Sequence, residues 1–322
     1  MKISQQGDAK PLLLKPINQL LDNTITPVLH EPSRLNTGDT VKLSSIFSQN
    51  GSLPSPAVLF VNTTGKTNPI NEPQPKGHNV SDGVWYSNTM KTADGGIIHL
   101  LTVDTKKVNV NVEFSEKGKS IAPSNFKGDN NFIAAINGQF YGDVGAIGDM
   151  KSGNKIYQDE KVSSSYDHFS DKRYFMGISD DGRIVTGKGG ISENGGTDSF
   201  NMFFGGMGVL YTKDQLKNLD KDIKDGEFSK RIIFSGSAQK DTISRSFLGI
   251  TKDGKLLLIA AGEGSIRSKG VDFVQAAHLM RSLGAVEAYI LDGGGSTSML
   301  VNGEKNANTD GRAVKSYISI KK

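Results

Sequence analysis

The sequence contains no cysteine among its 322 residues. This absence excludes disulfide bonds, a thiolate nucleophile and cysteine-ligated zinc. The sequence also lacks any apolar run near the ~20 residues that a membrane-spanning helix needs. Its first residues hold no apolar stretch of signal-peptide length. We therefore expect no membrane span and no Sec export, and a cytoplasmic or virion-associated location.

A strong excess of one charge is missing as well. The 38 basic and 34 acidic residues are spread along the chain and leave a net charge of +4. That charge is too small and too diffuse to indicate a nucleic-acid groove. Glycine, in contrast, is abundant at 38 residues, and much of it lies in D-G, N-G or G-G pairs. This composition predicts a turn-rich protein with many strands.

Two regions differ in composition. Residues 1–62 contain strand-like pieces such as "DTVKLSSIF", and residues 63–82 are rich in Pro, Gly, Asn and Thr, which disfavours regular structure. We predict a strand-containing N-terminal extension with a linker over 1–82 and one main domain over 83–322. The extension is a candidate attachment region for a virion or surface partner.

Period-two alternation predicts most of the strands. In "KVNVNVEF" the valines and Phe114 alternate with polar residues, and the preceding "GGIIHLLTVD" is joined to this segment by the turn "DTKK", which predicts a hairpin. "RYFMGISDDGRIVTG" and "RSFLGITKDGKLLLIAA" each predict two strands around a D-G turn. The second pair is apolar on both sides of its turn, so we expect it at the centre of a sheet.

One helix is predicted over "SKGVDFVQAAHLMRSLGA". Val271, Val274 and Ala277 recur at helical spacing, with Ser268 as the N-cap and Gly284 as the stop. Strands precede and follow this helix. The fold class that we predict is therefore α/β in the mixed α+β sense: a mixed, largely antiparallel sheet with packed helices, preceded by the short strand-containing extension.

The segment "LDGGGSTS" ends a predicted strand in an acid, three glycines and hydroxyl side chains. It lacks the lysine of a P-loop and the spacing of a dinucleotide fingerprint. Successive glycines allow amide N–H groups to converge on an anion, and an acid beside them suits a phosphorylated or polyhydroxylated ligand. A tight turn with an Asx cap is the alternative.

Several segments resemble, in order, the phosphodiester glycosidase family. They are "AAINGQFY", "FFGGMGVL", "SRSFLGITKDGKLLLIAAGEG", "GVDFVQAAHLMRSLGA", "GAVEAYILDGGGSTSMLVNGE" and "GRAVKSYISI". The resemblance covers roughly residues 85–322. It departs where the family commonly reads Asp-Gly-Arg and this chain reads Glu263-Gly264-Ser265.

The resemblance implies hydrolysis at the anomeric carbon of a sugar 1-phosphodiester, such as an N-acetylhexosamine-1-phosphate linkage. A bacterial cell-wall glycopolymer such as teichoic acid is a candidate substrate, with a bacterial or bacteriophage source. A phosphate leaving group needs little acid assistance, so we expect fewer groups for general acid catalysis and more groups that hold phosphate and stabilise an oxocarbenium-like sugar. One arginine, one or two carboxylates and the glycine-rich segment meet that requirement.

On this basis we expect Arg245 to clamp phosphate, Asp292 to act as general base, nucleophile or metal ligand, and Glu263 to be the second carboxylate. The expected substrate-binding residues are Asn137, Gly293, Gly294, Gly295, Ser296, Thr297 and Arg312, with Asp149 a weaker candidate. His278 is expected on a helix face and His168 in a polar loop. Asp292 and Asn137 oxygens suit calcium or magnesium, although spacing alone does not establish a metal site.

Two other functions remain open at this point. The chain could bind phosphorylated glycans without turning them over, a reading favoured by the altered Glu263-Gly264-Ser265 segment. It could instead be a phage or cell-surface attachment protein whose function resides in the extension.

Overall fold

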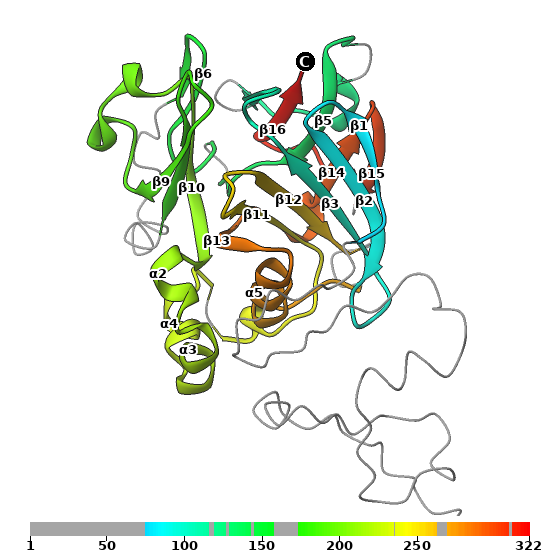
Figure 1. Cartoon of the computed structure of the whole chain (residues 1–322), viewed down its shortest axis with the longest axis vertical. Helices are drawn as coiled ribbons and strands as arrows, with labels where there is room; N and C mark the ends of the chain where they lie inside the picture. The colour runs from blue at the N-terminus through cyan, green and yellow to red at the C-terminus, as the bar shows by residue number, and fades with distance from the viewer. Residues whose placement is uncertain are drawn as a thin grey trace, which may run out of the picture. The chain divides into compact units, whose positions relative to one another are not determined.

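The computed structural model describes residues 75–115, 119–126, 129–142, 145–157, 173–234, 236–262, 269–308 and 311–322 (Figure 1). Most of the predicted extension and linker, up to residue 74, lies outside these residues. Within the described ranges, every helix is too short or too polar to cross a membrane.

The larger of two sheets contains eleven strands, and every pairing in it is antiparallel. Along its path lie β1 (His78–Ser81), β2 (Val84–Lys91), β3 (Ile97–Val103), β12 (Leu256–Ala261), β11 (Arg245–Thr251), β13 (Ala285–Ile290), β10 (Met202–Tyr211), β6 (Met150–Ser152) and β7 (Lys155–Tyr157). β8 (Tyr174–Ile178) pairs with β10 and with β9 (Ile184–Lys188). The two D-G hairpins, β8–β9 and β11–β12, are confirmed, and β11 and β12 are central as predicted.

The smaller sheet packs against one face of the larger one. Its order is β15 (Glu304–Asn308), β14 (Ser298–Val301), β5 (Phe132–Asn137), β16 (Ser316–Lys321) and β4 (Asn109–Phe114), again with antiparallel pairs. Leu101 and Leu258 of the larger sheet share one apolar cluster with Val110, Ile136 and Ile318 of the smaller sheet. The alternating valines of the sequence thus bury their face between two sheets.

The predicted hairpin between the segments now seen as β3 and β4 is wrong. β3 pairs with β2 and β12 in the larger sheet, whereas β4 pairs with β16 in the smaller one. The turn at residues 104–107 therefore carries the chain from one sheet to the other. Period-two alternation indicates only that a strand has one buried face. β3 and β4 bury these faces between the two sheets, not as neighbours in one sheet.

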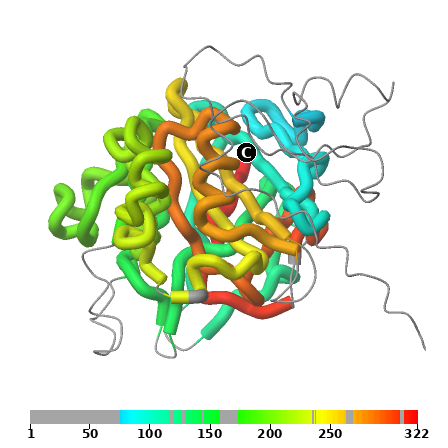
Figure 2. Tube along the Cα trace, turned by 90° about the horizontal axis from the view of Figure 1, so that it is seen from below, coloured from blue at the N-terminus to red at the C-terminus, as the bar shows by residue number. Residues whose placement is uncertain are grey.

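The helices cover the opposite face of the larger sheet (Figure 2). These helices are α2 (Lys213–Leu216), α3 (Leu219–Asp225), α4 (Glu227–Arg231) and α5 (Phe273–Ser282). Elsewhere the described chain has short 3₁₀ turns at η3 (Pro123–Phe126), η5 (Ser192–Asn194), η6 (Thr197–Ser199), η7 (Gly236–Gln239) and η8 (Gly294–Ser296). The described part is therefore a sheet-dominated α+β fold.

Helix α5 begins later than predicted. Its N-cap is Asp272, whose carboxylate accepts the Gln275 N–H at 2.7 Å while the Gln275 side chain accepts the Asp272 N–H at 3.0 Å. This capping box satisfies two amide groups at the first turn, so the helix does not need the predicted cap at Ser268, which lies outside the described residues. The predicted stop is confirmed, because Gly284 follows the helix with a φ of +85°.

Candidate active site

The glycine-rich segment crosses from one sheet to the other. β13 of the larger sheet ends at Ile290, and β14 of the smaller sheet begins at Ser298. Leu291 still pairs with the larger sheet, because its N–H donates to the Ser246 carbonyl at 3.0 Å. The acid, the glycines and the hydroxyl residues therefore lie at the junction of the two sheets.

Asn137 holds this junction together from the end of β5. Its Oδ1 accepts the Ser246 hydroxyl at 2.6 Å and the Ser298 N–H at 3.0 Å, and its Nδ2 donates to the Asp292 carbonyl at 2.7 Å. The side chain is fully buried. These bonds join β11 to both ends of the crossing segment, so the geometry favours a positioning role for Asn137 over direct contact with sugar.

Asp292 is the carboxylate at the start of the crossing. Burial raises its pKa from 3.8 to about 6, and the Ser296 hydroxyl, the Gly293 N–H and the positive charge of Arg312 oppose that rise. Oδ1 accepts the Gly293 N–H at 2.9 Å. A carboxyl group with such a pKa exchanges protons near neutral pH, which is what general acid–base chemistry requires.

Two of the three glycine N–H groups form hydrogen bonds with oxygens of the protein itself. The N–H of Gly293 donates to Asp292, and the N–H of Gly294 donates to the Ser244 carbonyl at 2.7 Å. Gly294 has a φ of +59°, which only glycine adopts readily. An open nest of three amide donors is therefore not formed, and the segment acts mainly as a tight, internally bonded crossing.

Arg245, the first residue of β11, is buried and firmly held. Its Nε donates to the Val271 carbonyl at 2.9 Å, and Nη2 donates to the carbonyls of Ala238 at 2.7 Å and Asp241 at 3.0 Å. The guanidinium carbon lies 3.8 Å from the centre of the Phe273 ring. Burial lowers the pKa of Arg245 to about 10, so the group stays charged at neutral pH.

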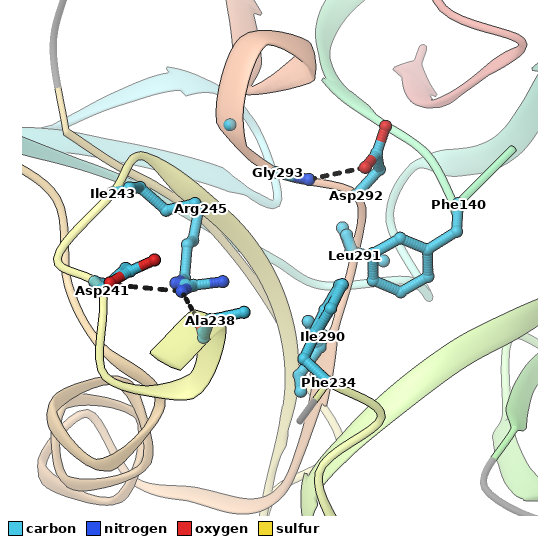
Figure 3. A pocket seen from close by; sticks show the side chains of 11 residues that line it. Phe140, Phe234, Ala238, Asp241, Ile243, Arg245, Ile290, Leu291, Asp292 and Gly293 are labelled. Carbon is cyan, nitrogen blue, oxygen red and sulfur yellow. Dashed lines mark hydrogen bonds between the residues drawn. The ribbon is translucent and has the colours of Figure 1, made fainter. Parts of the chain in front are cut away.

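A pocket brings Arg245 and Asp292 together. It has a volume of about 170 Å³ and is lined by Phe140, Phe234, Ala238, Asp241, Ile243, Arg245, Ile290, Leu291, Asp292, Gly293 and Gly294. Figure 3 shows Arg245, Asp241 and Ala238 on one side, Phe140 and Phe234 on the other, and Asp292 at one end. Among the described residues, Nε and Nη2 of Arg245 bind carbonyls, which leaves Nη1 for a ligand.

The other predicted residues divide into two groups. Ser296 and Thr297 are buried beside Asp292, and the Ser296 hydroxyl bonds its carboxylate. Exposed Arg312 acts on Asp292 through its charge. Asp149 instead lies away from this pocket and accepts the Ile191 N–H at 2.9 Å. His278 is buried on α5 next to Arg281, while Glu263 and His168 lie outside the described residues.

A metal ion does not fit the predicted pair of ligands. Both hydrogen bonds to Asn137 Oδ1 come from the protein itself, which leaves that oxygen poorly suited to a cation. Across the described ranges, no three His, Asp or Glu side chains converge on one point. The mechanism proposed below therefore uses no metal ion.

The family model for phosphodiester glycosidases matches residues 130–321, which include β5, Arg245, α5 and the whole glycine-rich crossing. The chain belongs to the phosphodiester glycosidase family. The family is named for glycosidase action on phosphodiesters, and this activity is the one proposed for the chain below. No curated protein sequence matches it significantly.

Two solved structures share this fold. A hypothetical protein from Synechocystis superposes with a TM-score of 0.56 at 14% identity, over 78% of this chain and 64% of that protein. The catalytic domain of zebrafish N-acetylglucosamine-1-phosphodiester alpha-N-acetylglucosaminidase, auto-inhibited by its pro-peptide, superposes with a TM-score of 0.55 at 18% identity, over 79% of this chain and 85% of that domain. At these identities the likeness concerns the fold. This chain spans less than two thirds of the Synechocystis protein.

Sequence reasoning missed the apolar side of the pocket. Phe140 belongs to the Asn-Gly-aromatic motif that the family shares, which was a usable signal for it. Phe234 and Asp241 carry no such signal, because they follow α4 in a segment without a motif. Only the folded chain brings them next to the end of β13.

Proposed function

We propose that this phosphodiester glycosidase hydrolyses a sugar 1-phosphodiester in the pocket between Arg245 and Asp292. The observation that carries the proposal is that one pocket holds both a buried cation and a carboxyl group with a pKa of about 6. The cation suits the phosphate, and the carboxyl suits the proton transfer.

In the proposed reaction, Asp292 as a carboxylate takes a proton from a water molecule. The water oxygen forms a bond to the anomeric carbon, and the bond from that carbon to the phosphate oxygen breaks. The electron pair leaves with the phosphate monoester. Arg245, fixed by its carbonyl partners, stabilises the charge on that leaving group without reorganising.

The leaving group explains why one carboxyl group can suffice. Ordinary glycosidases pair two carboxyl groups because an alkoxide must be protonated as it leaves. A phosphate monoester is a far weaker base, so it departs without that help. Asp241 also lines the pocket, and its backbone carbonyl accepts a hydrogen bond from Arg245.

The substrate class that we propose is an N-acetylhexosamine 1-phosphodiester, of the kind that also occurs in cell-wall glycopolymers such as teichoic acids. Support comes from the family and from the size of the pocket. About 170 Å³ is below the roughly 300–1,000 Å³ of sites for drug-sized ligands. The pocket is thus suited to the reacting end of the substrate, where the sugar meets its phosphate, while the rest of the molecule stays outside.

The test is hydrolysis by the full chain of UDP-N-acetylglucosamine, of a panel of sugar 1-phosphodiesters and of teichoic acid, with and without EDTA. We expect free sugar to be released from at least one member of the panel, at an unchanged rate in EDTA. Binding without turnover across the panel would overturn the proposal. Loss of activity in EDTA would show that a metal ion takes part after all.

A further inference from the structure

One wall of the pocket is aromatic and has no role in the chemistry described so far. Phe140 lies three residues after Asn137, and Phe234 lies just beyond the end of α4. Their rings meet edge to face, with centroids 5.3 Å apart and an interplanar angle of 72°. Both side chains are half-buried, and both line the pocket opposite Arg245 (Figure 3).

The rings are held in place by further aromatic packing. Phe234 stacks on Phe273 at 5.6 Å and 10°, and Phe273 is the buried first residue of α5. The other neighbour of Phe273 is the guanidinium of Arg245, 3.8 Å from the ring centre. A continuous series of contacts therefore links the aromatic wall to the cation and fixes the spacing between them.

We propose that Phe140 and Phe234 bind the C–H face of the sugar ring and determine which sugars the pocket accepts. A pyranose carries patches of C–H groups beside its hydroxyls, and an aromatic ring is a large apolar surface with a polarised face that suits such a patch. The opposite wall offers a cation instead. The pocket thus sorts the two halves of the substrate, with sugar against the rings and phosphate against Arg245.

This inference rests on the proposed function, since it assigns the sugar half of the same substrate. It can nevertheless be tested without turnover, because each wall should bind its own fragment. The probes are the methyl glycoside of N-acetylglucosamine for the aromatic wall and inorganic phosphate for the Arg245 wall. Binding of each to the full chain is followed by NMR titration.

The informative variants are Phe140→Leu, Phe140→Ala and Phe234→Leu. Losing a ring contact should weaken binding of the methyl glycoside roughly three- to tenfold, because an aromatic contact contributes about 0.5–1.5 kcal/mol beyond its area. Phosphate binding should stay the same. The matched control is Phe114→Leu, a half-buried ring on β4 that packs near Tyr157 and does not line the pocket.

The outcomes distinguish a failure of the proposed sugar-binding wall from a failure of the proposed hydrolysis. Unchanged glycoside affinity in both leucine variants, or an equal loss of glycoside and phosphate affinity, would overturn the assignment of the wall, as would failure of the wild type to bind the glycoside. If the wild type binds both fragments and the variants lose only the sugar, yet no phosphodiester is hydrolysed, the proposed function fails and the wall stands. Phe140→Leu keeps the test open if Phe140→Ala does not fold.

Discussion

The two sides of the pocket are built in different ways. On the polar side, Arg245 makes three hydrogen bonds to backbone carbonyls. Asn137, which is buried outside the pocket lining, makes three hydrogen bonds and holds the Asp292 carbonyl with one of them. On the apolar side, the Phe140 and Phe234 side chains make ring contacts and apolar packing contacts instead. Fixed charges stabilise a developing charge without reorganising. A packed ring, in contrast, can be replaced by another apolar side chain at little cost in folding stability. Substitutions on the polar side should therefore cost folding stability, and those on the apolar side should cost mainly binding.

The largest expected loss of stability follows Asn137→Ala. The variant leaves the Ser246 hydroxyl, the Ser298 N–H and the Asp292 carbonyl without their partner. With each such buried group at the lower end of about 1–3 kcal/mol, we expect the free energy of unfolding to fall by roughly 3–5 kcal/mol. Denaturant unfolding measures it. The control is Asn109→Ala, which removes an exposed side chain bonded to the Lys322 carbonyl. Equal denaturation midpoints for the two variants would contradict the stabilising role of Asn137.

The next largest loss of folding stability is expected for Arg245→Lys. Lysine keeps the charge but cannot reach three carbonyls with a planar fork, so the free energy of unfolding should fall by about 2–4 kcal/mol. Turnover should fall too. Arg183→Lys is the control, because Arg183 forms an exposed pair with Asp181 in which its side chain is 75% exposed. If both variants unfold at the same denaturant concentration, the internal bonds of Arg245 do not stabilise the fold.

A smaller effect is expected from pH. Burial lowers the pKa of both His99 and His278 to about 4. In the unfolded chain both histidines have a pKa near 6.5. The stability that the two neutral, buried histidines contribute to the fold is therefore present above pH 6.5 and is lost as the pH falls towards 4. Asp292 acts in the opposite sense, because its raised pKa of about 6 lets the folded state take up a proton first as the pH falls.

Thermal unfolding at pH 7.5 and 4.5 checks these signs. We expect a net loss of about 1–3 kcal/mol for the wild type at the lower pH. The loss should be smaller in His99→Gln and larger in Asp292→Asn, which lacks the compensating proton uptake. Identical pH dependence in all three proteins would show that these groups are not shifted as their burial indicates.

The smallest change in stability is expected for Phe140→Leu. A half-buried ring replaced by another apolar side chain should cost less than about 1.5 kcal/mol. Chemical denaturation is again the measurement, with the sugar affinity of the same variant beside it. A loss as large as that of Arg245→Lys would remove the distinction between the two sides.

Much of this fold could be predicted from local patterns. The D-G turns identified the β8–β9 and β11–β12 hairpins, and helical spacing with Gly284 identified α5. Strand partners could not be predicted in the same way. Alternating valines in β4 indicate a buried face, but the partner, β16, lies some two hundred residues later in the chain. The turn between β3 and β4 is equally compatible with a hairpin and with a crossing between sheets.

Of the predicted site residues, Arg245, Asp292, Gly293 and Gly294 line one pocket, and their roles stay predictions. The glycine-rich segment and Arg245 were expected near one another, and one pocket contains both. The side-chain oxygen of Asn137 accepts hydrogen bonds from Ser246 and Ser298, and the Gly294 N–H donates to the Ser244 carbonyl. All three bonds join segments that are far apart in the sequence. No local pattern encodes such contacts.

The most direct test of the central claim compares wild type with Asp292→Asn on whichever sugar 1-phosphodiester the wild type hydrolyses, measuring turnover and substrate affinity side by side. If Asp292 takes the proton from water, turnover should fall by at least about a hundredfold, while affinity stays within a few-fold. Turnover that survives the substitution, or a loss of turnover matched by an equal loss of affinity, would contradict the assignment of Asp292 as the catalytic base.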